Sequence, residues 1–123
     1  MPKKVILIGH CGPDSSYLRM TVGKAGRDIQ VLSADDDGEL SRVLGDGADL
    51  LLFNRQLDYG FDEQEGAALI RKLRPNYPNV KMMLVSNYPD AQAAAVAEGA
   101  LPGFGKREVN SPKVAEMIRE ALA

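Results

Sequence analysis

The chain has 123 residues, 45% of them hydrophobic and 26% charged, with a formal net charge of -2. This size suits one globular domain, 1–123. The basic residues are scattered, so they produce no positive electrostatic field that would favour nucleic acid as a partner. The apolar runs are too short to cross a membrane, so we expect a cytoplasmic protein without a membrane partner. The single cysteine, Cys11, excludes an internal disulfide and a structural zinc cluster.

Five strand-length apolar runs alternate along the chain with segments that have helical spacing. The expected strands cover 4–8, 29–34, 50–53, 81–85 and, more weakly, 103–105. The expected helices cover 15–24, 38–44, 65–73, 90–98 and 112–122. In the last helix, Ser111 and Pro112 form a capping signature, and Val114, Ile118 and Leu122 share one face. This amphipathic pattern is typical of a helix that covers a sheet.

Near-continuous apolar strands that alternate with helices are typical of a parallel sheet covered on both faces. We therefore predict an α/β fold of three layers, a doubly wound (βα)5 arrangement with a five-stranded parallel sheet in the order 2-1-3-4-5. Because β-α-β connections are right-handed, the first and fifth helices should cover one face of the sheet and the other three helices the opposite face.

The polar residues at the strand ends are the candidates for a functional site. In open parallel sheets, ligands bind in the crevice outside the C-terminal ends of the strands. The residues expected there are His10 and Cys11 after the first strand, Asn54 after the third, Ser86 after the fourth and Lys106 after the fifth.

Six segments spread over nearly the whole chain share the pattern of one protein family. They are KKVILI (3–8), ADLLLFN (48–54), GAALIRKLR (66–74), MMLVS (82–86), AEGA (97–100) and GFGK (103–106). Together they resemble the receiver domains of bacterial two-component response regulators. The resemblance implies a flavodoxin-like fold, and we expect one receiver-like domain with no output domain following it.

The resemblance also implies a role for each strand-end residue. Asn54 matches the aspartate that accepts a phosphoryl group in that family, and His10 and Cys11 match the acidic pair that holds Mg²⁺. Ser86 and Lys106 match two residues that contact the phosphoryl oxygens. The phosphoryl site is therefore only half retained.

Phosphoryl transfer to a carboxylate requires an ionised nucleophile and a cation that neutralises the developing charge. The amide of Asn54 offers no anionic oxygen. Mg²⁺ prefers carboxylate oxygens, so imidazole, thiol and amide should bind it poorly. We therefore expect no catalytic residue, no metal, no cofactor and no enzymatic activity.

These features predict an atypical receiver domain that acts as a phosphorylation-independent protein-interaction module in signal transduction. The family implies contact through the fourth helix, the fifth strand and the fifth helix, a face that would also allow a homodimer. In the fourth helix, DAQAAAVAEGA (90–100), most alanines are expected to pack inward. Gly103 replaces the aromatic switch residue of the family, and Phe104 is expected to face the core.

Two other functions remain open at this point. The first is a small-anion or redox sensor that uses Cys11, Ser86 and Lys106, with His10 as a solvated loop residue. In such a sensor, Lys106 or the N-terminus of the first helix would stabilise the thiolate of Cys11. Without the family's carboxylate partners, the Lys106 ammonium could attract an anion, reach solvent or pair with an aspartate, Asp14 or Asp58. The second is a conventional phosphorelay receiver whose misaligned acceptor is Asp58.

Overall fold

The computed structural model describes residues 2–57 and 60–123 of the chain. The strands are β1 (Lys3–Ile8), β2 (Ile29–Ala34), β3 (Leu50–Asn54), β4 (Lys81–Val85) and β5 (Leu101–Phe104). The helices are α1 (Gly12–Ala25), α2 (Asp37–Gly45), α3 (Gly66–Leu73), α4 (Pro89–Ala97), the 3₁₀ turn η1 (Lys106–Glu108) and α5 (Pro112–Leu122). The boundaries expected from the sequence hold to within a few residues.

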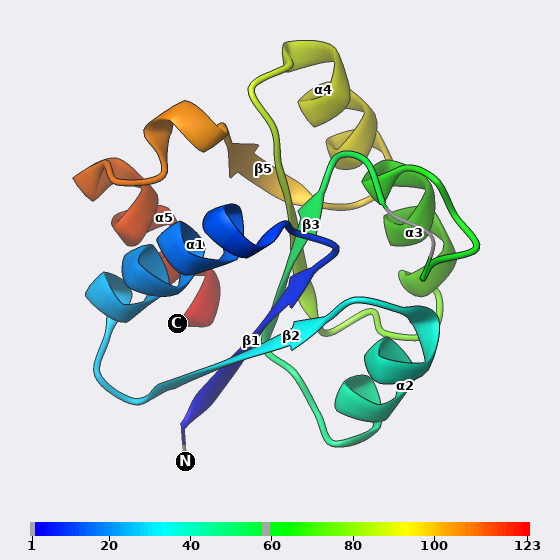
Figure 1. Cartoon of the computed structure of the whole chain (residues 1–123), viewed down its shortest axis with the longest axis horizontal. Helices are drawn as coiled ribbons and strands as arrows, with labels where there is room; N and C mark the ends of the chain where they lie inside the picture. Colours follow the sequence, from blue (N-terminus) through cyan, green and yellow to red (C-terminus); the bar gives the residue numbers. More distant parts are fainter. Residues whose placement is uncertain (1, 58–59) are drawn as a thin grey trace.

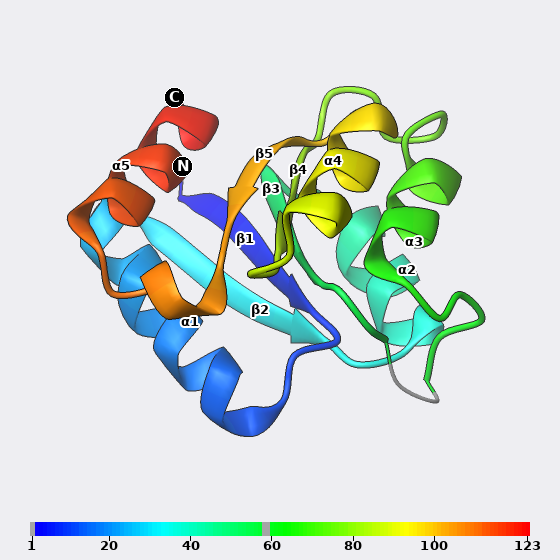
Figure 2. The ribbon, with the colours of Figure 1, turned by 90° about the horizontal axis from the view of Figure 1, so that it is seen from above.

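The strands form one parallel sheet in the order β2-β1-β3-β4-β5 (Figure 1). Helices α1 and α5 lie together on one side of the sheet, and α2, α3 and α4 lie on the other (Figure 2). The predicted three-layer fold, its strand order and its distribution of helices are therefore confirmed.

Alternating side chains of the strands build two separate cores. In β1, Ile6 and Ile8 point toward the α2–α4 layer, and Val5 and Leu7 point toward the α1–α5 layer. Because successive side chains of a strand face opposite sides of the sheet, a central strand that is covered on both faces must be apolar throughout. The near-continuous apolar runs of β1, β3 and β4 follow from this geometry.

The pairing of β4 with β5 is irregular. Met83 pairs with Leu101 and Val85 pairs with Phe104, so β5 has one more residue than β4 between the two pairs. This arrangement is a β-bulge. The strand begins two residues earlier than expected because Pro102 and Gly103 mask its sequence signal: both are poor strand formers.

The alanines of α4 do not pack inward as the sequence interpretation expected. Of the residues in this helix, only Ala95 is buried. Four small apolar residues on it are exposed: Ala93, Ala94, Val96 and Ala97. The sequence interpretation was wrong here because alanine has little apolar area to bury and gives no periodic signal that distinguishes an inner from an outer face.

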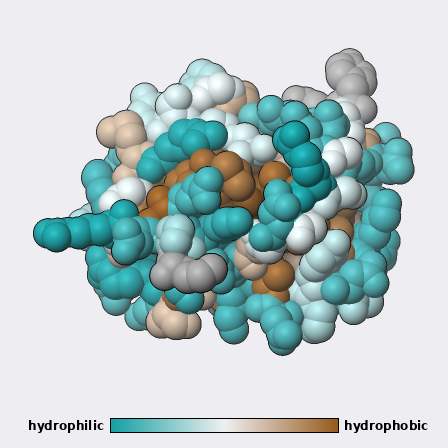
Figure 3. Space-filling view, turned by 90° about the horizontal axis from the view of Figure 1, so that it is seen from below, coloured by the Kyte–Doolittle hydropathy of each residue, from teal (hydrophilic) through white to brown (hydrophobic). Residues whose placement is uncertain are grey.

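The surface on the opposite side of the molecule from α4 is mostly hydrophilic. Figure 3 views the protein from below Figure 1 and shows a confined apolar hollow ringed by hydrophilic side chains.

Among the described residues, no helix combines the length and apolar character that crossing a bilayer requires.

Candidate functional site

The expected site residues lie at the C-terminal edge of the sheet. Asn54 is the last residue of β3, Ser86 follows β4 directly, and Lys106 opens the η1 turn after β5. On the β1 side, His10 and Cys11 follow Gly9, whose φ of 72° lies in the left-handed region that favours glycine. A side chain at Gly9 would also meet Leu57 at 2.6 Å. The tight turn at Gly9 therefore directs the loop after β1 into the crevice.

Asn54 uses its whole amide group to join neighbouring backbone segments. Its Nδ2 donates to the carbonyl oxygens of Gly9 and Gln56, each at 3.0 Å. Its Oδ1 accepts a hydrogen bond from the backbone N–H of Arg55, also at 3.0 Å. An aspartate could not make the two donor contacts. The neutral amide at this strand end therefore has a structural role that links β3 to the loop after β1.

His10 is buried, which corrects the interpretation that it is a solvated loop residue. Its side chain keeps 7% exposure, and its Nε2 lies 2.8 Å from the carbonyl oxygen of Leu52. A carbonyl only accepts, so Nε2 carries the proton and Nδ1 is unprotonated. Nδ1 is buried and has no hydrogen-bond partner among the described residues. The ring is therefore a neutral core group that donates to a backbone carbonyl of β3.

The surroundings of His10 disfavour its charged form. Burial lowers the pKa of His10 from its usual 6.5 to about 4. The hydrogen bond to Leu52 opposes this effect, and the positive charge of Lys106 adds to it. The pH dependence that follows is derived in the Discussion.

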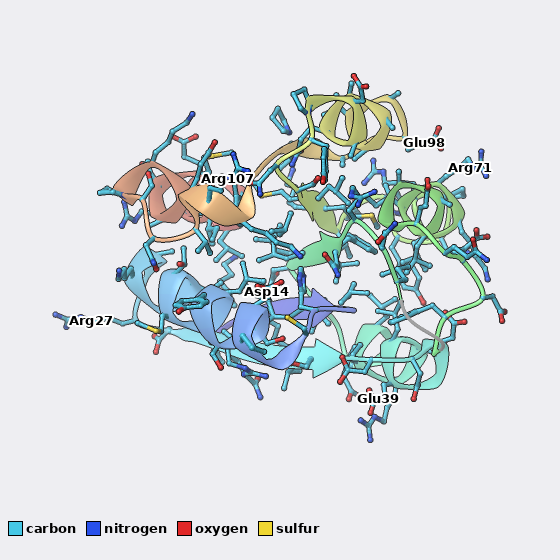
Figure 4. The ribbon with its side chains drawn as sticks, turned by 45° about the horizontal axis from the view of Figure 1, so that its top comes forward. Asp14, Arg27, Glu39, Arg71, Glu98 and Arg107 are labelled. Carbon is cyan, nitrogen blue, oxygen red and sulfur yellow. The ribbon has the colours of Figure 1, made fainter. Side chains whose placement is uncertain are left out.

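Lys106 has a carboxylate partner. Its Nζ lies 2.9 Å from Oδ2 of Asp14, in the first turn of α1, and Figure 4 shows Asp14 on the inner side of that turn. Lys106 therefore pairs with one of the two aspartates that the sequence interpretation considered, and its ammonium is not left for an external anion. Asp58, the other partner considered, lies outside the described residues. Both side chains of the pair are part exposed, so the ion pair contributes at most about 1 kcal/mol.

Asp14 also brings Cys11 into this cluster. Hydrogen bonding from Lys106 lowers the pKa of Asp14, burial opposes the shift, and a hydrogen bond from the Cys11 thiol lowers it further. Cys11 itself is exposed. The redox alternative assumed that the Lys106 ammonium or the N-terminus of α1 stabilises the thiolate of Cys11. The structure instead places a carboxylate next to both groups.

The donors expected for a bound anion are mostly occupied. Both hydrogens of the Asn54 amide point at carbonyl oxygens, and Lys106 is paired with Asp14. The hydroxyl of Ser86 is buried and accepts a hydrogen bond from the backbone N–H of Tyr88 at 3.1 Å, which leaves its own O–H able to donate. Within residues 2–57 and 60–123, no hydrogen bond or ion pair joins Lys106 to Ser86 or Asn54.

The residues present do not fit a Mg²⁺ ion. Among the described residues, Asp14 is the only carboxylate in this cluster and it is held by Lys106, while Asn54 already uses its Oδ1. No group of three or more His, Cys, Asp or Glu side chains suited to a metal occurs in the described parts of the chain. A hard cation that needs several carboxylate or carbonyl oxygens therefore finds too few ligands here.

Gln92 is a crevice-wall residue that the sequence interpretation missed. It projects from α4 and contacts β4 and β5 through its amide. Together with Ser86 and Gly103 it lines a depression of about 350 Å³ beside the ends of those strands. The one available signal was a lone amide among alanines, which is too weak to predict a partly buried contact with the sheet.

Two solved structures show the same architecture over the whole chain. The signal receiver domain of an HD domain-containing protein from Pseudomonas fluorescens Pf-5 is 18% identical, with a TM-score of 0.80 over 98% of this chain and 87% of that chain. A response regulator from Thermotoga maritima is also 18% identical, with a TM-score of 0.78 over 99% of this chain and 98% of that chain. The chain has the fold of a response-regulator receiver domain.

A third receiver structure with this fold is a dimer. It is the beryllofluoride-activated NtrC4 receiver domain dimer, which is 14% identical to this chain, with a TM-score of 0.74 over 97% of this chain and 95% of that chain. No family model and no curated protein sequence matches the chain. The similarity to receiver domains is therefore one of three-dimensional structure.

Proposed function

We propose that this chain is an atypical receiver domain that takes up no phosphoryl group by the aspartyl route. It acts instead as a protein-interaction module in signal transduction, without enzymatic activity. One observation carries the proposal. At the strand end where receivers hold their acceptor, the Asn54 amide is hydrogen-bonded to three backbone groups. An amide has no anionic oxygen to attack phosphorus.

The described part of the crevice also lacks the ligands for a cation, which is the second requirement of phosphoryl transfer. His10 is neutral and buried, and the nearest carboxylate, Asp14, serves Lys106. The described residues therefore offer no cation site that would neutralise charge on a transferred phosphoryl group. The acceptor carboxylate and the cation ligands are thus both missing from this part of the crevice, which supports a function that does not depend on phosphorylation. The conformation of the domain then depends on its own sequence and on its partners, since a ligand shifts an equilibrium only through differential affinity.

We expect no phosphoryl group on the wild-type protein after incubation with acetyl phosphate and Mg²⁺. Intact mass should show no added species of about 80 Da. Asn54→Asp should also label poorly, because the metal ligands are still missing. A receiver domain with a complete acidic site, treated in parallel, shows that the donor is active. An adduct on the wild-type protein would contradict the proposal.

The proposed interaction face is formed by α4, β5 and α5. On α4 and just before it, Tyr88 is 59% exposed and Val96 is 43% exposed, and neighbouring alanines are also exposed. Exposed apolar groups gathered on one helix are more typical of a contact surface than of a solvated one. The dimeric NtrC4 receiver domain is a precedent for self-association in this fold. We therefore include a second copy of this chain among the partners.

Self-association should depend on the α4 face. We expect sedimentation velocity to show a dimer at high protein concentration, and Val96→Asp should weaken it at least about tenfold because a charge would have to be desolvated in the interface. Met20→Asp on α1 is the matched control, since Met20 is 58% exposed on a different helix. A protein that stays monomeric throughout, or equal effects of the two variants, would show that α4 forms no such contact.

A further inference from the structure

Helix α4 is attached to the sheet by very little apolar surface. It buries one side chain, Ala95, whereas α5 buries five residues. A helix in a globular protein normally gains its stability by burying an apolar stripe. Ala91 also packs against the core, but it is only partly buried. Polar contacts should therefore contribute to holding α4 in place.

The side chain of Gln92 makes such contacts. Its Nε2 lies within hydrogen-bonding distance of the carbonyl oxygens of Leu84 at 2.9 Å, Ser86 at 3.1 Å and Phe104 at 3.3 Å. Because the group has two hydrogens, two of these carbonyl oxygens share one of them. Its Oε1 accepts from the backbone N–H of Gly103 at 3.1 Å. One amide therefore bonds to both β4 and β5.

The bulge between these strands explains why an amide fits there. The extra residue of β5 lies between the Met83–Leu101 and Val85–Phe104 pairs. A bulge interrupts the ladder of backbone hydrogen bonds and leaves groups that need other partners. Gln92 supplies a donor to Leu84 and an acceptor to Gly103, as a peptide group would.

Gly103 is the residue that makes this close approach possible. A Cβ at this position would lie 2.0 Å from the carbonyl oxygen of Leu84 and 2.9 Å from Oε1 of Gln92. Any side chain at position 103 would therefore separate β5 from β4 and displace the amide. The glycine and the glutamine form one structural unit.

We propose that Gln92 is the anchor that holds α4 on β4 and β5, so that the outer face of α4 is presented in one fixed position. Gln92 is a positioning residue: its amide contacts the sheet, and the exposed residues of α4 make the contacts with a partner. The consequence for partner binding, a fixed contact face on α4, rests on the interaction function proposed above. The anchor itself is a property of the isolated domain.

Hydrogen exchange tests the anchor directly. In Gln92→Met, which keeps the length of the side chain but removes its polar atoms, the amides of Gly103 and α4 should exchange at least about tenfold faster. The amides of β1 and β3 should change far less. The matched control is Gln30→Met, at an exposed position on β2, and it should leave all of these rates unchanged. Unchanged exchange in α4, or an equal increase throughout the chain, would overturn the proposal.

A second measurement needs no variant and keeps the proposal testable if Gln92→Met does not fold. In the wild-type protein, the side-chain amide protons of Gln92 should exchange at least about tenfold more slowly than those of Gln30 and Gln64, which are exposed. Equal rates for the three side chains would overturn the proposal. Neither experiment requires a partner. Failure of the anchor and failure of self-association are therefore observed separately, and either one can fail while the other holds.

Discussion

Lowering the pH from 7 to 5 should reduce the free energy of unfolding by about 2 kcal/mol because of His10 alone. The pKa of His10 is about 4 in the folded protein and 6.5 as its usual value. Between these two values the unfolded chain binds a proton that the folded protein does not. Acidification therefore favours the unfolded state. The contribution of the neutral ring is fully present above pH 6.5 and is lost progressively as the pH falls to about 4.

The composition of the chain makes this prediction easy to isolate. His10 is the only histidine, so its ring signals in an NMR titration need no assignment and should move with a midpoint near 4 rather than 6.5. Denaturant unfolding at several pH values gives the free energy. His10→Gln is the control, because it retains an amide N–H for the carbonyl of Leu52 but does not titrate. A midpoint near 6.5, or the same pH dependence in the control, would show that the ring is solvated.

Asn54→Asp should destabilise the protein by about 3 kcal/mol at neutral pH. The substitution keeps the shape of the side chain but replaces the Nδ2 donor by an oxygen. That oxygen would face the carbonyl oxygens of Gly9 and Gln56, which now lie 3.0 Å from the nitrogen. Two hydrogen bonds would become two repulsive contacts, and no bound cation would offset the added charge.

Denaturant unfolding of two further variants separates the causes. Asn79→Asp makes the same chemical change at an exposed position and should alter stability by less than about 0.5 kcal/mol. Asn54→Ala removes the donor without adding charge and should fall between the wild type and Asn54→Asp. If Asn54→Asp were as stable as the wild type, the amide would not be the reason that asparagine occupies this strand end.

The architecture could be predicted because it depends on local patterns. The apolar runs 29–34 and 81–85 and the amphipathic helix 112–122 coincide with β2, β4 and α5. Alternation of strands and helices limits the topology to few arrangements, and the expected order is the one observed. Less regular segments were harder to predict: β5 begins two residues earlier than expected, and the η1 turn was not expected.

The site could be predicted in position but not in its contacts. Because parallel strands end at the same edge of a sheet, the sequence placed Asn54, Ser86 and Lys106 correctly in the crevice region. It did not show that Lys106 pairs with Asp14 or that His10 is buried. Both facts depend on how one loop packs against another, and local sequence patterns do not predict such packing.

The sequence by itself determined the strand and helix pattern, the parallel sheet and the absence of an ionisable group at position 54. These features follow from periodicity and from the chemistry of single residues. Only the tertiary structure decided what the polar side chains do. Asn54 bonds to Gly9 45 residues away, and His10 bonds to Leu52 42 residues away. Gln92 reaches two strands that meet only in the folded sheet. The free energy of such contacts depends on distance and burial, which are defined only once the chain has folded.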